Sequence, residues 1–254
     1  MNRKPDGLPK FDFRTVFNPD DYLHFYVNSL SDEITSLQVD FLVSQMALSS
    51  PMKILDLACG HGRHANRLAQ LGHQVTGVDI MPGFLKIAGQ EAKKLGLDVT
   101  YLKGDMRHIT FPNQFDRVIL MFTAFGYFSD EENFLVLKNI ARALKPGGLF
   151  CFDTHNRDVF LKGFLPFIVV ERGKDLLIDR NSFDTTTGRF INKRIIIRNG
   201  RRKDAPFFVR FYNFNEISGL LKKAGLPVQA VYGDWHTKPF TSDSRRMIII
   251  AKKE

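Results

Sequence analysis

Residues 54–65, ILDLACGHGRHA, contain the turn that decides the fold. The run Lys53 to Leu57 is short and apolar, as in a buried strand, and a helical pattern begins at Arg63. Between them, the spacing Gly60-x-Gly62-x-x-Ala65 allows the backbone to approach a ligand in front of a helix N-terminus. The stretch therefore predicts a strand, a ligand-binding turn and a helix.

The strand–turn–helix unit repeats through the first part of the chain. Short apolar runs predict strands over 53–57, 74–78, 99–102, 118–121 and 149–152. Amphipathic patterns predict helices within 20–48 and over 63–71, 84–95 and 131–144. Buried strands that alternate with helices are typical of a parallel sheet covered on both faces.

The alternation stops after the fifth strand. From Phe167 to Tyr212 the pattern becomes strand, turn, strand, with breaks at 172–174, 184–188 and 199–204, which predicts three or four antiparallel strands. A helix over 215–224 and strands over 228–232 and 247–251 return to the first pattern. We expect an α/β fold with a doubly wound, Rossmann-like seven-stranded sheet, mostly parallel with an antiparallel last strand. Its parts are a helical lid (1–48), the main domain (49–156 and 214–254) and an antiparallel insertion (157–213).

Composition excludes several classes of protein. A chain of 254 residues that is 44% hydrophobic and 25% charged is neither disordered nor fibrous. The N-terminus has no apolar run typical of a signal peptide, and 118–128 is too short to cross a bilayer. The two cysteines, Cys59 and Cys151, cannot form a disulfide framework. A cytoplasmic protein without a membrane partner is expected.

The net charge of +9 is concentrated in the second part of the chain. Residues 1–153 hold 16 basic and 17 acidic residues, whereas residues 154–254 hold 20 basic and 10 acidic ones. Seven of the basic residues fall within 189–203, which contains no acidic residue. This segment could be the solvated face of a sheet, a site for an anionic small molecule, or a grip on nucleic acid.

Three aspartates indicate which ligand the glycine turn holds. Asp56 precedes the turn, while Asp79 and Asp105 follow the next two strands, so all three lie at the carboxyl edge of the sheet. Asp79 suits the two hydroxyls of a ribose. Asp56 would repel the pyrophosphate of a dinucleotide, so we favour a cationic ligand that contains adenosine without phosphate, namely S-adenosylmethionine.

The chain resembles the class I S-adenosylmethionine-dependent methyltransferases in LDLACGHG, VTGVD, GDMR, FDRVILMFTAFGYF, LKPGG and the closing antiparallel pair. The resemblance implies that backbone at Ala58–Gly60 holds the methionine part of the cofactor and that Asp79 binds the ribose. Ile80, Asp105 and the Met106 backbone would contact adenine, and Met121 would lie near the cofactor. The expected cofactor-binding residues are Tyr26, Asp56, Ala58, Cys59, Gly60, Gly62, Asp79, Ile80, Asp105, Met106 and Met121.

The acceptor site is expected to follow the fourth and fifth strands. His155 is the candidate general base, and the candidate pocket residues are Phe122, Phe125, Tyr127 and His236. Tyr22 and Tyr26, four residues apart, could reach the cofactor from the lid, and Arg63 could pair with its carboxylate. Core packing, a surface position or a backbone hydrogen bond could explain each of these residues instead.

No metal is expected. His61 and His64 belong to the cofactor turn, where a bound ligand leaves no room for zinc. The sequence Met121-Phe122-Thr123-Ala124 lacks the aspartate of magnesium-dependent catechol-type enzymes and the Asn/Asp-Pro-Pro-aromatic signature of adenine or glutamine methylation.

The insertion resembles the antiparallel sheet of glycine N-methyltransferases and amino-sugar N-methyltransferases, which covers the acceptor and can form a dimer interface. We therefore expect methyl transfer to nitrogen or oxygen of a small-molecule acceptor, with an anionic acceptor among the options, by a monomer or homodimer. Two alternatives stay open: an RNA methyltransferase that holds phosphates with 189–203, and a cofactor-binding protein without turnover.

Overall fold

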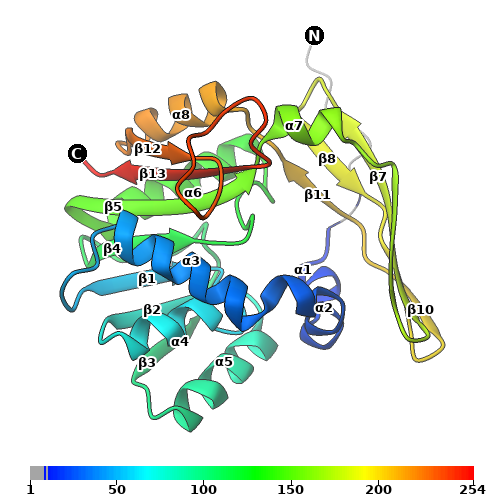
Figure 1. The fold of residues 1–254 in the computed structure, drawn as a ribbon, viewed down its shortest axis with the longest axis horizontal. Coiled ribbons are helices and arrows are strands. Elements are labelled where there is room, and N and C mark those ends of the chain that lie inside the picture. Colours follow the sequence, from blue (N-terminus) through cyan, green and yellow to red (C-terminus); the bar gives the residue numbers. More distant parts are fainter. Residues whose placement is uncertain (1–8, 10) are drawn as a thin grey trace.

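A seven-stranded sheet forms the larger part of the computed structural model, which describes residue 9 and residues 11–254 (Figure 1). Its strands are β1 (Lys53–Leu57), β2 (Gln74–Asp79), β3 (Val99–Lys103), β4 (Phe115–Leu120), β5 (Leu144–His155), β12 (Val228–Tyr232) and β13 (Arg246–Lys252). They lie in the order β12-β13-β5-β4-β1-β2-β3. Strands β1 to β5 run parallel, and β13 is antiparallel to both β5 and β12. The predicted fold class is confirmed.

The order of the strands reverses between β1 and β4. From β1 the chain proceeds through β2 to β3 at one edge, and then crosses back to place β4 on the other side of β1. In open α/β sheets the crevice at such a switch point is where ligands bind. The β5 strand extends beyond the predicted 149–152 because β13 continues to pair with it as far as Arg246 and His155.

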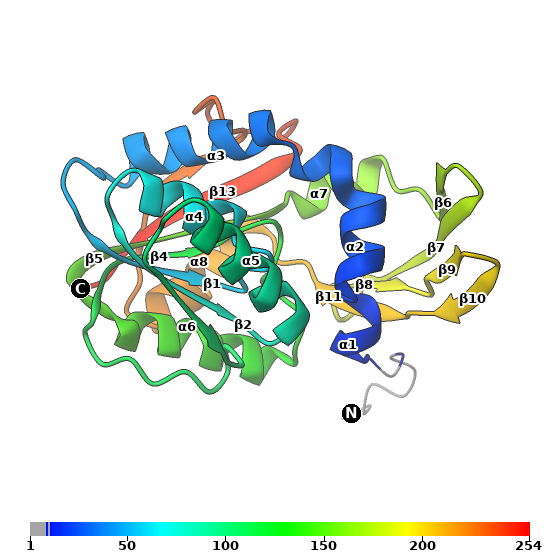
Figure 2. The same ribbon diagram turned by 90° about the horizontal axis from the view of Figure 1, so that it is seen from below.

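Two layers of helices cover the sheet (Figure 2). One face carries α3 (Asp32–Gln45), α4 (Arg63–Gln70) and α5 (Pro82–Lys94), and the other carries α6 (Asp130–Ala143) and α8 (Phe214–Lys223). A buried apolar cluster lies between the sheet and each layer of helices. In α6 and α8, capping boxes of Ser129 with Glu132 and of Asn213 with Glu216 satisfy the first backbone N–H groups.

The insertion contains a short helix, α7 (Arg157–Lys162), and six strands rather than the predicted three or four. The strands are β6 (Phe167–Arg172), β7 (Asp175–Asp184), β8 (Arg189–Asn192), β9 (Ile195–Arg198), β10 (Arg201–Asp204) and β11 (Phe207–Arg210). Residues 189–197 form two strands, because the chain leaves the first half of the sheet at Lys193 and Arg194.

The predicted break at 199–204 is confirmed at Asn199 and Gly200 but is too long, because residues 201–204 form β10. Asn199 and Gly200 have φ of 51° and 72°, the geometry of a two-residue hairpin turn, and β10 pairs back onto β9. The hydrophobic pattern could not predict this strand, because its sequence, RRKD, contains no apolar residue.

The N-terminal helices α1 (Phe13–Val16), α2 (Pro19–Tyr26) and the 3₁₀ turn η1 (Val27–Leu30) lie against the insertion (Figures 1 and 2). Val16 and Phe25 share a buried cluster with residues of β7, β9 and β11. Residues 1–8 and 10 of the predicted lid lie outside the described part of the chain. Within that part, the helices are too short or too polar to cross a membrane.

Candidate active site

The turn after β1 is shaped by three residues in the left-handed region. Ala58, Gly60 and Gly62 have φ of 51°, 55° and 79°. A Cβ at Gly62 would lie 2.8 Å from that of Ala88 and collide with the Tyr101 hydroxyl, so only glycine fits there. A Cβ at Gly60 would meet nothing within 4 Å, since this residue faces the pocket. The first glycine therefore keeps the site open, and the second allows the turn to pack on the sheet.

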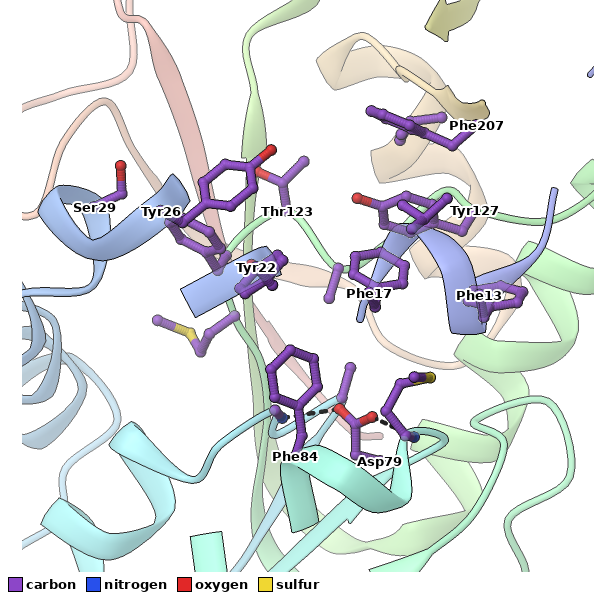
Figure 3. A pocket seen from close by; sticks show the side chains of 18 of the residues that line it. Phe13, Phe17, Tyr22, Tyr26, Ser29, Asp79, Phe84, Thr123, Tyr127 and Phe207 are labelled. Atoms are coloured by element: carbon purple, nitrogen blue, oxygen red, sulfur yellow. Dashed lines mark hydrogen bonds between the residues drawn. The ribbon is translucent and has the colours of Figure 1, made fainter. Parts of the chain in front are cut away.

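Asp79, at the end of β2, ties the glycine turn to the start of α5. Its Oδ2 accepts the Gly60 N–H at 2.9 Å and its Oδ1 accepts the Met81 N–H at 2.8 Å. Burial raises the pKa of this carboxyl, while the backbone N–H groups oppose the rise. Figure 3 shows the carboxylate between the two N–H groups, at one end of the pocket.

Asp56 and Arg63 each bring an unpaired polar atom to the same pocket. Asp56 is 1% exposed, and its Oδ2 finds no hydrogen-bond partner among the described residues. Arg63 donates from Nη1 to Thr35 at 3.0 Å and to Gln38 at 2.6 Å, yet its buried Nη2 has no partner in the same part of the chain. An acceptor and a donor left unpaired in one pocket fit a ligand that carries both an ammonium and a carboxylate.

Burial determines the charge state of Asp56. Desolvation, reinforced by the negative charge of Asp79 and opposed by Arg63, raises the pKa of Asp56 to about 8. The carboxyl is therefore largely protonated at neutral pH without a ligand, and a cation beside it would favour the ionised form.

Asp105 follows β3 and is held by Arg107. The guanidinium donates to both carboxylate oxygens, at 3.1 Å from Nε and 2.6 Å from Nη2, and also reaches Glu132. Burial opposes ionisation, but these hydrogen bonds lower the pKa of Asp105. The carboxylate therefore stays charged at the pocket wall beside Met106.

A cavity of about 570 Å³ joins this cofactor side to the insertion. Its size lies within the range of ~300–1,000 Å³ that is usual for ligand sites. Asp79 and Phe84 lie at one end and Phe207 at the other, with Phe17, Tyr22, Tyr26 and Tyr127 between them (Figure 3). One continuous pocket thus extends from the glycine turn to β11.

Most residues predicted for the site line this pocket: Tyr26, Asp56, Ala58, Cys59, Gly60, Asp79, Ile80, Asp105, Met106, Met121, Phe122, Tyr127 and His155, together with Tyr22 and Arg63. Gly62 packs on Tyr101 instead. The expectation for Phe125 is corrected, because its ring lies in the core, 5.7 Å from the rings of Phe152 and Tyr212. His236 is corrected as well: it lies exposed in the β12–β13 loop, outside the pocket.

His155 lies at the end of β5, 5.4 Å from the ring of Phe211 and 5.6 Å from that of Phe160. Burial, with a smaller contribution from Arg246, lowers the pKa of His155 to about 4. The imidazole is therefore uncharged at neutral pH and is a weak base, because efficient general bases have a pKa near the working pH.

The polar residues that line the pocket and were not predicted from the sequence include Asp179, Asn181, Asn192, Arg194 and Arg246. On β7 and at the end of β8 they occur two apart, as Asp-x-Asn and Asn-x-Arg. On β7 this spacing puts Asp179 and Asn181 on one face of the strand, whereas Arg194 lies just after the end of β8. The polar alternation within an apolar sheet was the available signal, but it does not say which face meets the pocket.

Five of the seven cations in the basic segment 189–203 form ion pairs with aspartates. Arg198 and Lys203 pair with Asp21 of α2, and Arg189 pairs with Asp130. Arg194 pairs with Asp179, and Arg202 pairs with Asp204. Several of these cations therefore dock the N-terminal helices and the main domain rather than forming a free basic surface.

No group of three or more His, Cys, Asp or Glu side chains in the described part of the chain is arranged to hold a metal. His64 lies 2.9 Å from the Gln38 oxygen, and burial lowers the pKa of His61 to about 4.

Comparison with known proteins agrees with this geometry. Residues 54–148 match a family of methyltransferase domains. A putative methyltransferase of Bacillus subtilis (strain 168), YqeM, is 28% identical over 216 residues, which cover 82% of this chain and 87% of the relative.

Two solved structures share the fold. An S-adenosylmethionine-dependent methyltransferase from Clostridium acetobutylicum ATCC 824 superposes with a TM-score of 0.79 at 19% identity, covering 92% of this chain and 98% of the other. The sugar N-methyltransferase KedS8 from Streptoalloteichus sp ATCC 53650 gives a TM-score of 0.68 at 18% identity, covering 100% and 97%.

The matching methyltransferase domain, the relative and the shared fold therefore support a class I S-adenosylmethionine-dependent methyltransferase. The residues around the pocket fit S-adenosylmethionine, the cofactor of this class. Asp56 and Arg63 hold unpaired atoms that suit the ammonium and carboxylate of its methionine part. Asp79 and Asp105 line the same pocket at the ends of β2 and β3, where they would be available to the ribose and adenine of such a ligand.

Proposed function

We propose that this enzyme methylates nitrogen of a small-molecule acceptor bound between the cofactor turn and the inserted sheet. The observation that carries the proposal is the single pocket that joins Gly60 and Asp79 to Phe207 and Phe211 of the insertion. A site of this shape admits two ligands end to end, which in-line transfer between them requires. The sugar N-methyltransferase KedS8 shares the overall architecture, which supports a small acceptor.

S-adenosylmethionine supplies a methyl group on a sulfonium that is already activated for displacement. The chain's own task is to align the acceptor and exclude water, an effect worth up to roughly 7–11 kcal/mol. Aromatic side chains from three parts of the chain line the space: Phe17 and Tyr22 from the N-terminal segment, Phe122 and Tyr127 after β4, and Phe207 from β11. Their rings keep bulk water away from the reacting nitrogen.

The state of His155 supports nitrogen over oxygen. A neutral amine is nucleophilic without help, whereas a hydroxyl gains from a general base. Since burial lowers the pKa of His155 to about 4, this side chain suits an acceptor that needs no strong base. His155 would then accept a hydrogen bond from the amine and orient it.

The pairing of the basic segment argues against the RNA alternative. Arg198 and Lys203 are engaged by Asp21, and Arg194 is enclosed in the pocket with Asp179. Phosphate binding would require these cations to be free. We therefore propose no nucleic-acid partner. The two cysteines, both free and buried, suit a reducing compartment, and we place the enzyme in the cytoplasm.

The direct test is turnover with methyl-labelled S-adenosylmethionine and a panel of small primary and secondary amines, alcohols and short RNAs. We expect stoichiometric binding of the cofactor and label transfer to one or more amines. Transfer only to alcohols would contradict the nitrogen assignment, and transfer only to RNA would contradict the small-molecule acceptor. Cofactor binding without transfer to any of them would favour a protein without turnover.

A further inference from the structure

The inserted sheet presents a compact group of four polar side chains to the end of the pocket far from Asp79. Asn181 of β7 and Asn192 of β8 are directly opposite partners in the antiparallel ladder. Asp179 lies two residues before Asn181, and Arg194 lies two residues after Asn192. All four line the pocket, as do Phe190, Phe207 and Phe211.

The charges within this group are already satisfied. Arg194 donates from Nε to Asp179 Oδ1 at 2.7 Å and from Nη2 to Oδ2 at 2.9 Å. The same Nη2 lies 2.9 Å from the Tyr26 hydroxyl, and the guanidinium carbon lies 4.8 Å from the centre of the Phe207 ring. The buried pair has no net charge, so it does not call for a charged ligand.

The two amides, by contrast, have free hydrogen-bonding capacity. Asn192 is 1% exposed, and its Oδ1 has no partner among the residues that the structure describes. The same holds for the buried Oδ1 of Asn181 within the described chain. The Asn181 Nδ2 donates to the Leu165 carbonyl at 2.9 Å, which orients the amide so that its oxygen is the free end. Two buried acceptors without donors are costly unless a ligand supplies the donors.

We infer that Asn181 and Asn192 form a specificity subsite for an uncharged hydrogen-bond donor, a hydroxyl or an amide N–H, at the end of the acceptor away from the methylated atom. The inference rests on the proposed small-molecule acceptor. A carboxylate at this end would face two carbonyl oxygens, because Arg194 is taken by Asp179 and Tyr26. A second ammonium would lack a free carboxylate, since Asp179 is paired. The acceptor would thus be a polar amine and not an anion.

A matched set of ring amines tests the inference by binding alone. The probes are trans-4-aminocyclohexanol, cyclohexylamine, trans-4-aminocyclohexanecarboxylate and trans-1,4-diaminocyclohexane, titrated into the protein saturated with S-adenosylhomocysteine. We expect the alcohol to bind at least about tenfold more tightly than the other three, since a site built for a hydroxyl penalises its loss or replacement. Equal affinities, a preference for a charged probe or no binding of the alcohol would overturn the inference.

Two variants link the preference to the amides. Asn192→Leu and Asn181→Leu keep side-chain size but remove the oxygen, and each should abolish the preference for the alcohol while the affinity for S-adenosylhomocysteine stays unchanged. Asn215→Leu, at an exposed position of α8, is the matched control and should keep the preference. A preference that persists in both pocket variants would overturn the inference. The ranking of the probes on the wild type decides the question even if a variant fails to fold.

The two proposals fail in distinguishable ways. If the alcohol binds through Asn192 but no amine is ever methylated, the proposed function fails and the subsite stands. If amines with and without the hydroxyl are bound and methylated equally well, the subsite fails and the proposed function stands.

Discussion

The backbone N–H of Phe122 lies 2.6 Å from the Oδ1 of Asp153, a carboxyl that is fully buried. Phe122 and Thr123 have φ of 65° and 58°, so two successive residues after β4 adopt the left-handed region without being glycine. The other carboxylate oxygen pairs with Arg246, whose Nη2 also donates to the Thr123 hydroxyl at 2.8 Å. This network holds the strained turn at the wall of the pocket.

Removing the Asp153 carboxylate should therefore lower the stability of the protein. We expect Asp153→Ala to lower the free energy of unfolding by about 3–5 kcal/mol, because Arg246 would be left as an uncompensated charge. Urea denaturation measures the loss. Asp243→Ala, at an exposed position of the β12–β13 loop, is the control and should change stability by less than about 0.5 kcal/mol. An equally stable Asp153→Ala protein would show that the turn does not depend on this carboxylate.

Asp79→Ala should weaken cofactor binding. The change removes the acceptor for the N–H groups of Gly60 and Met81 as well as the group that fits the ribose. Hydrogen bonds to a charged group contribute about 1.5–3 kcal/mol each, so we expect the affinity for S-adenosylhomocysteine to fall by about 100-fold or more. Isothermal titration calorimetry measures it. Unchanged affinity would mean that the glycine turn binds its ligand without this carboxylate.

The pKa of Asp56 predicts how stability varies with pH. Because burial raises this pKa from 3.8 to about 8, the folded protein keeps a proton that the unfolded chain releases. Stability of the ligand-free protein should therefore fall as the pH rises from about 4 to about 8, and Asp56→Asn should remove most of that slope. Unfolding free energies at pH 5 and pH 8 test this. A wild-type slope retained in Asp56→Asn would assign it to other groups.

Cofactor binding should release the proton of Asp56. At pH 7 the ligand-free carboxyl is mostly protonated, and a bound cation favours its ionised form. Titration of S-adenosylmethionine in buffers with different ionisation enthalpies reports the number of protons released. We expect a release that approaches one proton per site in the wild type and none in Asp56→Asn. Release that is identical in the two proteins would contradict this origin.

His155→Gln should have a modest effect on turnover with amines. General-base catalysis typically contributes ~10²–10⁴-fold, but a histidine with a pKa near 4 is poorly matched to neutral pH. We expect the rate to fall less than about tenfold, and the pH–rate profile between pH 6 and pH 8 to keep its shape. A loss of 100-fold or more, together with a changed profile, would restore His155 as the base.

Much of the main domain followed from local patterns. Strands β1, β2 and β4 are apolar runs buried on both faces, and the residues that end them mark the carboxyl edge of the sheet. The turn from Ala58 to Gly62 and the position of Asp79 could thus be predicted before any contact was known. The strand β10 could not, because RRKD has no hydrophobic period and its pairing with β9 depends on the Asn199–Gly200 turn.

By itself, the sequence determined the sheet, the cofactor turn and the carboxylates that follow the strands, because these depend on spacing along one chain. Only the tertiary structure decided that Arg198 and Lys203 meet Asp21, that Phe125 belongs to the core, and that Asn181 and Asn192 face the pocket. Those relationships join segments far apart in sequence. Residue type reveals that a side chain is charged, apolar or polar, but its partner is fixed by how the inserted sheet and the N-terminal helices pack over the cofactor edge.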